Sequence, residues 1–260
     1  MKTALVTGGT GKDIAAMAVL ALNIKETNSS WIDELVIFHD GIGNKDQDLI
    51  KSIFPSRFER YKCPISRLQQ FQNKSVRYFS PMVFCKYECF RLLDDYDMVI
   101  WSDYDILIKG DISEITGGTE NICIVVNENE ILRNMFFKSI EKHDMSEYDM
   151  NGACICTPLF VLKKGLSGYK EYYQWCYTMT KRYIRDLYLP EQCVITMLIQ
   201  KYKLPLDRID RNIYAVHPRE DSPEAKILHS YGPSKFWNGL DHEGWNNYYQ
   251  QWRSMGGSRI

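Results

Sequence analysis

The sequence predicts an α/β fold, a Rossmann-like α/β/α sandwich around a mixed but mainly parallel sheet. Short apolar runs alternate with longer segments in which apolar residues recur at helical spacing, which is typical of strands joined by crossover helices. Small and acidic residues directly follow two of these runs, as expected where strands of such a sheet end beside a ligand. No internal repeat, linker or low-complexity tract divides the 260 residues, so we expect a single domain over residues 1–260.

The first 110 residues show the clearest alternation. Residues 3–7 form a short apolar run, a Gly-rich turn follows, and apolar residues recur at helical spacing over residues 13–25. A strand, a turn and a helix in this order make one α/β unit. We expect a second strand at 34–39, helices at 46–53 and 80–93, and a strand that ends at Asp103.

The remainder of the chain continues this pattern with longer helices. Apolar runs predict strands at 121–126 and 154–162, and helical spacing predicts helices at 168–187 and 190–201. The tail, residues 239–260, is rich in tryptophan and tyrosine. Such a tail favours a packed terminal helix over the alternative, peripheral contact with a membrane surface.

Composition limits the classes of partner. The chain has 32 basic and 33 acidic residues, so it lacks the broad positive charge of nucleic-acid-binding proteins. The apolar run at the N-terminus is too short for a signal peptide, and no segment reaches the roughly 18 apolar residues of a membrane span. We expect a cytoplasmic protein. If residues 239–260 instead contact a membrane surface, the protein would lie at the inner face of that membrane. The eight cysteines include no C-x-x-C pair, which favours reduced, buried thiols over a zinc site or disulfides.

The most informative segment is an apolar run that ends in two carboxylates, Asp103 and Asp105, before a second apolar run. Alternate side chains of an extended chain share a face, so both carboxylates can point the same way. Carboxylates that interrupt a buried pattern need a cation or hydrogen-bond donors. A divalent cation held there can bridge the two phosphates of a nucleotide diphosphate.

A second segment, residues 227–237, combines three residue types suited to the same ligand. His229 offers a nitrogen ligand to a cation such as manganese, Gly232 allows the backbone to approach a phosphate, and Lys235 can neutralise that phosphate. Each residue alone is commoner in plain packing or surface roles, but the combination is informative.

The two segments resemble glycosyltransferase family 8, which includes glycogenin and the bacterial lipooligosaccharide galactosyltransferases. The resemblance rests on the D-x-D and on the H-x-x-G-x-x-K that begins at His229, and it covers most of the chain. It also includes the helix at 80–93, the segment 150–153 and the pair Glu191-Gln192. It implies the GT-A fold, with a nucleotide-sugar half at about 1–110 and an acceptor half with the tail at about 111–260.

The resemblance also implies roles for individual residues. Asp103, Asp105 and His229 match ligands of Mn²⁺ or Mg²⁺, and Gly232 and Lys235 match positions that hold the diphosphate. The implied catalytic residues are Asn151 and Glu191, which contact the donor sugar, and Gln192, which faces the anomeric carbon. Thr7, Gly8 and Asp13 belong to the turn that touches the uridine, and Lys86, Ser102 and Tyr104 complete the expected donor site.

The implied reaction is transfer of a hexose, with retention of configuration, from a UDP-sugar to a hydroxyl of a glycan or glycolipid acceptor. Glu191 stands where relatives commonly have Asp, which leaves the donor sugar open between galactose and glucose. No strong nucleophile stands out, so the resemblance favours front-side attack assisted by the leaving diphosphate. By analogy, the product is a surface polysaccharide or lipooligosaccharide. The oligomeric state stays open.

Two alternatives come from other classes. Residues 6–14 resemble the Gly-rich turn of NAD(P)-dependent short-chain dehydrogenases, and Tyr177 with Lys181 has their Y-x-x-x-K spacing. However, Ile14 replaces the third glycine, and this interpretation leaves the D-x-D without a role. The other alternative is a non-catalytic sugar-nucleotide-binding protein with the same fold.

Overall fold

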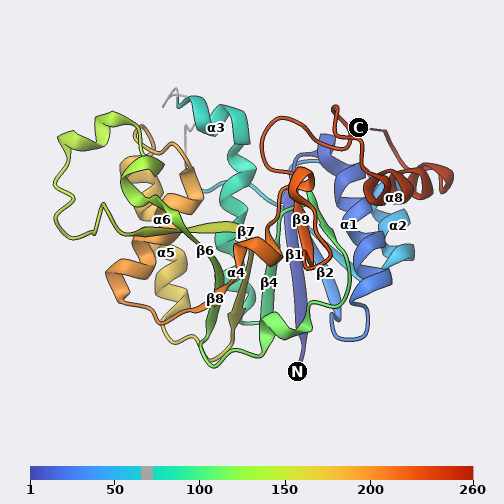
Figure 1. Ribbon diagram of the computed structural model, residues 1–260, viewed down its shortest axis with the longest axis horizontal. Coiled ribbons are helices and arrows are strands. Elements are labelled where there is room, and N and C mark those ends of the chain that lie inside the picture. The colour runs from blue at the N-terminus through green and yellow to red at the C-terminus, as the bar shows by residue number, and fades with distance from the viewer. Residues whose placement is uncertain (66–72, 260) are drawn as a thin grey trace.

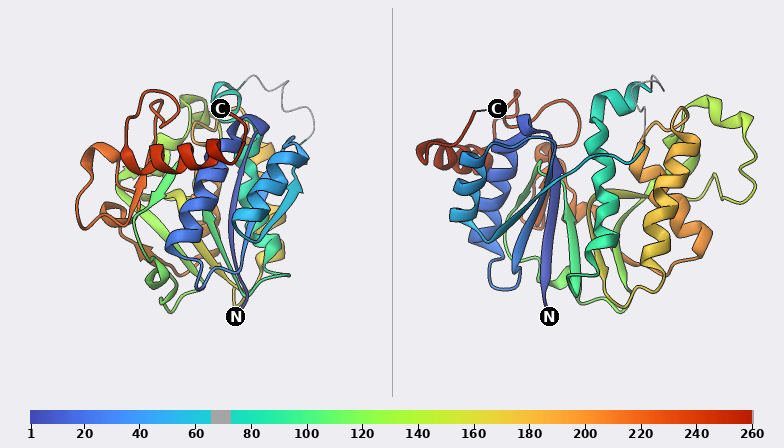
Figure 2. Two further views of the ribbon diagram at one scale, coloured as in Figure 1. Left: turned by 90° about the vertical axis from the view of Figure 1, so that its right-hand side faces the viewer. Right: turned by 180° about the vertical axis from the view of Figure 1, so that it is seen from behind.

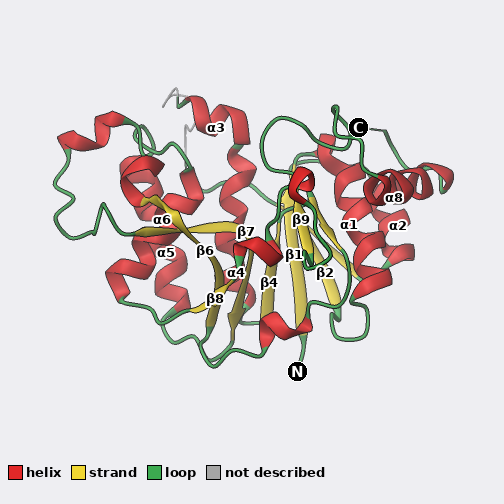
Figure 3. Ribbon diagram, in the orientation of Figure 1, coloured by secondary structure: helices red, strands yellow, loops and turns green. Residues whose placement is uncertain are grey.

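Seven strands form one twisted sheet that runs through the molecule, with helices on both faces (Figure 1, Figure 3). The computed structural model describes residues 1–65 and 73–259, and within them the strand order is β3-β2-β1-β4-β7-β6-β8. Strands β1 (Thr3–Gly9), β2 (Glu34–His39), β3 (Ser56–Arg60) and β4 (Met98–Ser102) are parallel to one another. The predicted α/β fold with a mainly parallel mixed sheet is confirmed.

The parallel half is built from short apolar strands whose alternate side chains enter two different cores. In β1, Ala4 and Val6 pack in one core and Leu5 packs in the other. The core on the Leu5 side is covered by α1 (Ile14–Thr27), α2 (Asn44–Ile53) and α8 (Glu243–Ser254). Strands buried on both faces need helices on both faces, and this requirement produces the three layers.

The second half extends the same sheet with strands of mixed direction. Strand β7 (Ala153–Lys163) pairs antiparallel with both β4 and β6 (Ile122–Ile131), and β8 (Asp207–Ile209) is parallel to β6. Helices α5 (Tyr169–Tyr183) and α6 (Pro190–Tyr202) contribute to the core opposite to the one that α1 covers. Figure 2 shows α5 and α6 at the end of the molecule opposite to α2 and α8.

Two segments far apart in sequence form a separate two-stranded ribbon. Strand β5 (Ile106–Ile108) follows Asp105 directly and pairs antiparallel with β9 (Ile227–His229), so that Ile106 lies opposite His229. The backbone N–H of Ser230 donates to the carbonyl of Asp105 at 3.0 Å. This ribbon brings the two informative segments of the sequence together.

The structure differs from the predicted elements at several places. The helix expected at 80–93 is a 3-10 helix, η3 (Pro81–Tyr87), followed by α4 (Glu88–Leu92). The hydroxyl of Ser80 caps the start of η3 by accepting from the backbone N–H of Met82 at 3.1 Å. Several short elements were not predicted from the sequence, namely β3, α3 (Lys74–Phe79), β8, α7 (Arg211–Tyr214) and β9. Short elements carry little periodicity, which is why sequence patterns miss them.

The tail forms the packed terminal helix that the sequence favoured. Helix α8 lies against α1, and the side chains of Trp245 and Trp252 are fully buried. The indole N–H of Trp252 donates to the carbonyl of Ser258 at 2.8 Å. These aromatic side chains therefore stabilise the interior. Within residues 1–65 and 73–259, no helix has both the length and the apolar character needed to cross a membrane.

Candidate active site

A cavity of about 630 Å³ opens where β1 and β4 end and the β5–β9 ribbon begins. It gathers residues from both halves of the chain. The sequence-predicted residues that line it are Gly8, Asp13, Lys86, Asp103, Tyr104, Asp105, Glu191, Gln192, His229, Gly232 and Lys235. Ligands of open α/β sheets bind at the carboxyl ends of the strands, and this cavity lies there.

The D-x-D is held in place from both sides. The backbone N–H of Asp103 donates to the carbonyl of Pro158 at 2.8 Å, and the indole of Trp101 donates to Asp103 Oδ1 at 2.8 Å. Tyr104 and Asp105 form a turn between β4 and β5, where we expected extended chain. The turn still directs both carboxylates to one centre, because the ribbon fixes Asp105 and β4 fixes Asp103.

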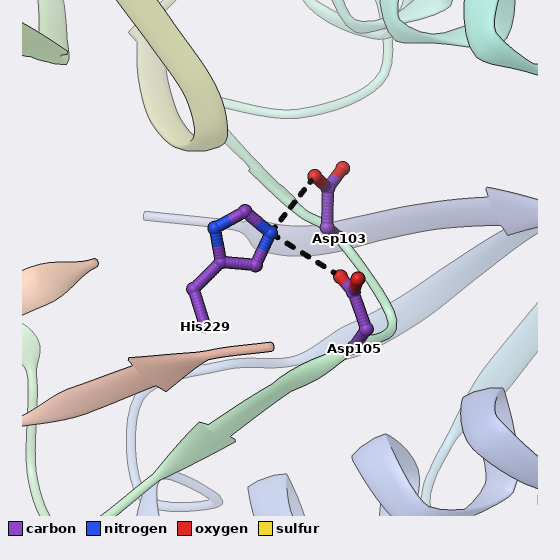
Figure 4. Close-up of side chains that lie close together, drawn as sticks. All are labelled: Asp103, Asp105 and His229. Atoms are coloured by element: carbon purple, nitrogen blue, oxygen red, sulfur yellow. Dashed lines mark ion pairs between the residues drawn. The ribbon is translucent and has the colours of Figure 1, made fainter. Parts of the chain in front are cut away.

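His229 completes a three-residue cluster with these carboxylates (Figure 4). Its Nε2 lies 3.7 Å from Asp103 Oδ2 and 3.4 Å from Asp105 Oδ1. One ligand atom from each side chain lies within 4.8 Å of the other two. Two carboxylates and an imidazole at this separation fit a divalent cation that accepts oxygen and nitrogen ligands, such as Mn²⁺.

Lys86 neutralises the neighbouring acid groups from within the protein. Its Nζ lies 3.0 Å from Asp103 Oδ1 and 2.9 Å from Glu191 Oε1, and the side chain is almost fully buried. Burial alone would lower the pKa of Lys86, but the carboxylates of Asp103 and Glu191 outweigh it and raise the pKa above its usual value. Lys86 is therefore a permanent cation between Glu191 and the group of Asp103, Asp105 and His229, which we call the metal-ligand cluster because its geometry is suited to a metal ion.

Lys235 does the same for the other carboxylate of the D-x-D. Its ammonium group forms an ion pair with Asp105 and donates to the carbonyl of Ser230. Burial would raise the pKa of Asp105, but His229 and Lys235 hold it well below its usual range. Asp105 is thus ionised, and Lys235 lies directly beside the cluster of Asp103, Asp105 and His229.

Glu191 is positioned by a residue that the sequence analysis missed. The hydroxyl of Thr157 donates to Glu191 Oε1 at 3.0 Å, and Lys86 Nζ donates to both the hydroxyl and the carbonyl of Thr157 at 3.2 and 3.1 Å. Thr157 lies on β7, next to the Pro158 that anchors the D-x-D. Its signal in the sequence was weak, a polar residue inside an apolar run.

The structure places Asn151 away from the other predicted site residues. Asn151 is exposed in the turn before β7, and its backbone N–H donates to Asp149 Oδ1 at 3.0 Å. It borders a separate surface hollow with Arg133 and His143, and it does not line the main cavity. Residues 150–152 precede β7, whereas Thr157, which contacts Glu191, lies six positions after Asn151 and within β7.

Thr7 and Ser102 also lie outside the cavity lining, although both were predicted to belong to the donor site. Both side chains are fully buried in strands. The hydroxyl of Ser102 donates to the carbonyl of Asp103 at 2.9 Å, so it supports the D-x-D from behind. At β1 the cavity is lined instead by Gly8 and Gly9, because the strand backbone itself faces it.

Further lining residues come from segments with no predicted role. They are polar or aromatic residues of β6, α7, α3 and the loop after β9, namely Asn127, Glu130, Arg211, Tyr78, Phe79 and Tyr231. The run Asn-Glu-Asn-Glu after the apolar residues 122–126 was the available signal for the first two, because it repeats the pattern of acids after a strand.

Of the residues that suggested a dehydrogenase, Tyr177 is packed in the core. The hydroxyl of Tyr177 lies 2.9 Å from that of Tyr61 and donates to Glu88 Oε1 at 2.8 Å, inside the core. Neither Tyr177 nor Lys181 lines the cavity. The Y-x-x-x-K spacing is therefore a coincidence of helix α5.

Comparisons with known proteins give a consistent result. The sequence model of the family described as Glycosyl transferase family 8 matches residues 13–241. No curated protein matches the chain.

Among solved structures, the galactosyltransferase LgtC bound to donor and acceptor sugar analogs has a TM-score of 0.72 at 12% identity, over 97% of this chain and 99% of that one. GlyE of Streptococcus pneumoniae has a TM-score of 0.61 at 16% identity, over 100% of this chain and 66% of that one. Mouse xyloside xylosyltransferase 1 has a TM-score of 0.57 at 12% identity, over 89% and 98% of the two chains. At these identities the likeness shows a shared fold.

Proposed function

The chain belongs to glycosyl transferase family 8 and is a glycosyltransferase with the GT-A fold, and from this premise we propose that it transfers a hexose from a UDP-sugar to a hydroxyl of a glycan acceptor. One observation carries the proposal most directly. Asp103, Asp105 and His229 meet beside Lys235, so that a divalent cation and a lysine would face the same diphosphate.

Each group has a chemical task in this proposal. A bound Mn²⁺ or Mg²⁺ would withdraw charge from the diphosphate as the bond to the sugar breaks. Lys235 adds a second positive charge on the same leaving group, which assists departure without a proton donor. Gly232 has φ +87°, a conformation that glycine adopts readily, and it presents backbone without a side chain where the diphosphate approaches. Asp13 and Gly8 line the end of the cavity that we assign to the uridine.

We assign the donor sugar to the space beside Glu191 and Gln192. Glu191 is locked by Lys86 and Thr157, so its remaining carboxylate oxygen can accept a hydrogen bond from a sugar hydroxyl without changing position. Gln192 also faces the cavity, and an amide is a weak nucleophile. We therefore propose retaining transfer by front-side attack, with the departing diphosphate taking the proton of the acceptor hydroxyl.

The proposed donor is UDP-galactose or UDP-glucose, and the proposed acceptor is a glycan of a surface polysaccharide or lipooligosaccharide made on the cytoplasmic side. Membrane contact through the tail is not part of this proposal, because the two tryptophans that prompted it are buried. The dehydrogenase alternative is not favoured, because Tyr177 and Lys181 lie outside the cavity that the Gly-rich turn lines.

The first test is thermal unfolding with a panel of nucleotide sugars and NADP, each with and without Mn²⁺. We expect one UDP-hexose to raise the melting temperature only when Mn²⁺ is present, and product detection with that donor would follow. A shift with NADP and with none of the UDP-sugars would overturn the proposal. Hydrolysis of the stabilising UDP-sugar separates an enzyme from a non-catalytic binding protein.

A second test uses the variants Asp103→Ala and Asp105→Ala, with Asp48→Ala as the matched control. Asp48 is exposed on α2, and among residues 1–65 and 73–259 its only ion pair is with Lys51 at 3.7 Å, so its loss should change nothing. We expect both site variants to lose Mn²⁺-dependent turnover while far-UV circular dichroism stays unchanged. Normal turnover in either variant would rule out the metal assignment.

A further inference from the structure

One cation of the cavity stands apart from the others. Four residues that can carry positive charge line it, and three of them face carboxylates: Lys86, His229 and Lys235. The fourth, Arg211, has no carboxylate oxygen within 4.0 Å among residues 1–65 and 73–259. Its Nη1 donates a long hydrogen bond to the amide oxygen of Asn127 at 3.5 Å. Its guanidinium carbon lies 5.7 Å from the centroid of the Tyr231 ring.

The backbone of Arg211 is held firmly relative to the metal-ligand cluster. Arg211 begins α7, where Asp210 accepts a hydrogen bond from the backbone N–H of Asn212 at 2.8 Å. The loop after α7 is joined to β9 by the bond from the N–H of His229 to the carbonyl of Val216, also 2.8 Å long. The segment that carries Arg211 is thus tied to the strand that carries His229.

The order of strands in the sheet indicates which substrate Arg211 faces. The cavity is lined in turn by Gly8 on β1, Asp103 after β4, Thr157 on β7 and Asn127 on β6, and these strands are consecutive in the sheet. Neighbouring strands lie about 4.8 Å apart, so β6 is roughly 14 Å from β1. If the uridine lies at β1, the diphosphate at β4 and the donor sugar at β7, the next position belongs to the acceptor.

The charged side chains at that position indicate which chemical groups an acceptor would carry. Glu130, at the far end of β6, has no cationic partner among the described residues and accepts a hydrogen bond from Asn134 Nδ2 at 2.6 Å. A free carboxylate suits sugar hydroxyls, which are donors. The planar guanidinium of Arg211 suits a carboxylate or phosphate, which it can bind with two parallel hydrogen bonds.

We propose that Arg211 binds an anionic substituent, a carboxylate or a phosphate, on the acceptor sugar, so that this enzyme prefers acidic acceptors over neutral ones. The inference rests on the proposed function. The ring of Tyr231, which Arg211 faces, directly precedes Gly232, the residue that we assign to the diphosphate. The donor diphosphate is therefore the other anion that Arg211 would reach. The experiment must distinguish binding of the acceptor anion from binding of the diphosphate.

The experiment measures binding to the full chain loaded with Mg²⁺ and UDP. Isothermal titration first gives the affinity for UDP, and ligand-observed NMR then compares methyl β-glucoside, methyl β-glucuronide and glucose 6-phosphate. The variant is Arg211→Gln. The matched control is Arg208→Gln, because Arg208 is exposed and pairs with Glu128 outside the cavity.

We expect at least one acidic sugar to bind about tenfold more tightly than the neutral glucoside, as a charge-assisted bond allows. Arg211→Gln should reduce this preference to within about twofold and leave UDP affinity unchanged, whereas Arg208→Gln should keep both. Equal binding of all three sugars would overturn the inference, and so would a tenfold loss of UDP affinity in Arg211→Gln, which would assign the residue to the diphosphate. If UDP fails to bind the wild type, the proposed function fails and the inference fails with it.

Discussion

At the scale of single residues, the site is organised by its lysines. Lys86 lies between Asp103 and Glu191, and Lys235 lies against Asp105. Without these cations, three carboxylates would face each other in a partly buried space, which carries a large electrostatic cost. The same ion pairs hold these three carboxylates in position around the cavity.

Removing Lys86 should therefore damage both stability and activity. Lys86→Met leaves Glu191 with no cationic partner among the residues that the structure describes. We expect a loss of roughly 3–5 kcal/mol in the free energy of unfolding, as is typical for one broken partner of a buried pair. Lys86→Arg keeps the charge and should recover most of this loss. Urea denaturation measures it, and a change below about 1 kcal/mol in Lys86→Met would contradict this account.

Thr157 and Asn151 offer a paired test of which residue acts on the donor sugar. Thr157→Val has nearly the same shape but lacks the hydroxyl that binds Glu191, so we expect a loss of about 1–2 kcal/mol in stability and a roughly tenfold drop in kcat/KM for the stabilising UDP-sugar. Asn151→Ala should change neither, because Asn151 is exposed outside the cavity. Steady-state kinetics of both variants measures the change in kcat/KM and shows which of the two residues supports activity. A larger loss in Asn151→Ala would restore the original assignment.

At the scale of elements, the site depends on how closely β1 approaches η3. A Cβ on Gly8 would lie 2.4 Å from Cys85 Sγ and 3.1 Å from Phe38 Cβ. Cys85 is fully buried and directly precedes Lys86 in η3. Only glycine lets this strand and this helix pack at the distance that places Lys86 next to Asp103.

Gly8→Ala should therefore cost about 1–3 kcal/mol through overpacking, and it should weaken Mn²⁺-dependent binding of the UDP-sugar by displacing η3. Adding Cys85→Ala removes the atom that clashes. In a double-mutant cycle we expect the two changes to be coupled by about 1 kcal/mol or more in the compensating direction. Simple additivity of the two stability changes would show that β1 and η3 adjust independently.

At the scale of the whole molecule, one sheet contains strands from residues 1–110 and from residues 111–260. Strand β4, from the first 110 residues, pairs on one side with β1 and on the other with β7, from the second half. Cutting the chain near residue 110 would expose the edge of β4 in the middle of the sheet. We propose that the chain is a single domain and that neither half folds alone.

The test of the single domain is equilibrium unfolding in urea, followed by tryptophan fluorescence and by far-UV circular dichroism. We expect one transition with the same midpoint for both probes, as cooperative unfolding requires. The fragment 1–110 should lack a cooperative transition. Two separated transitions, or a stable fragment, would establish two independent domains.

Buried tyrosines predict how the whole molecule responds to alkaline pH. Burial raises the pKa of Tyr61, Tyr87 and Tyr177 well above the usual value near 10. Above that pH the unfolded chain loses these protons while the folded chain keeps them, so stability present below pH 10 is lost progressively as the pH rises.

We expect the melting temperature to fall between pH 9 and about 11, and Tyr177→Phe should make the decline shallower because one such group is removed. Thermal unfolding followed by circular dichroism measures both slopes. A melting temperature that stays constant over this range would contradict the assignment.

The sequence by itself determined the α/β class, the main strands and helices, and the two motifs of the metal-ligand cluster. These features are local: apolar periodicity dictates each long element, and the D-x-D and the H-x-x-G-x-x-K carry their chemistry within a few residues. The family followed from the same two motifs. The residues with the strongest local pattern, Asp103, Asp105, His229 and Lys235, are the ones that the structure brings together.

Only the tertiary structure decided which other side chains reach the cavity. Asn151 looked suitable but lies in the turn before β7, whereas Thr157, inside an apolar run, contacts Glu191. Arg211 belongs to a four-residue helix that no periodicity marks. Their positions depend on the register between β4, β7 and β6 and on the β5–β9 ribbon, and such long-range pairing is set by how the whole core packs.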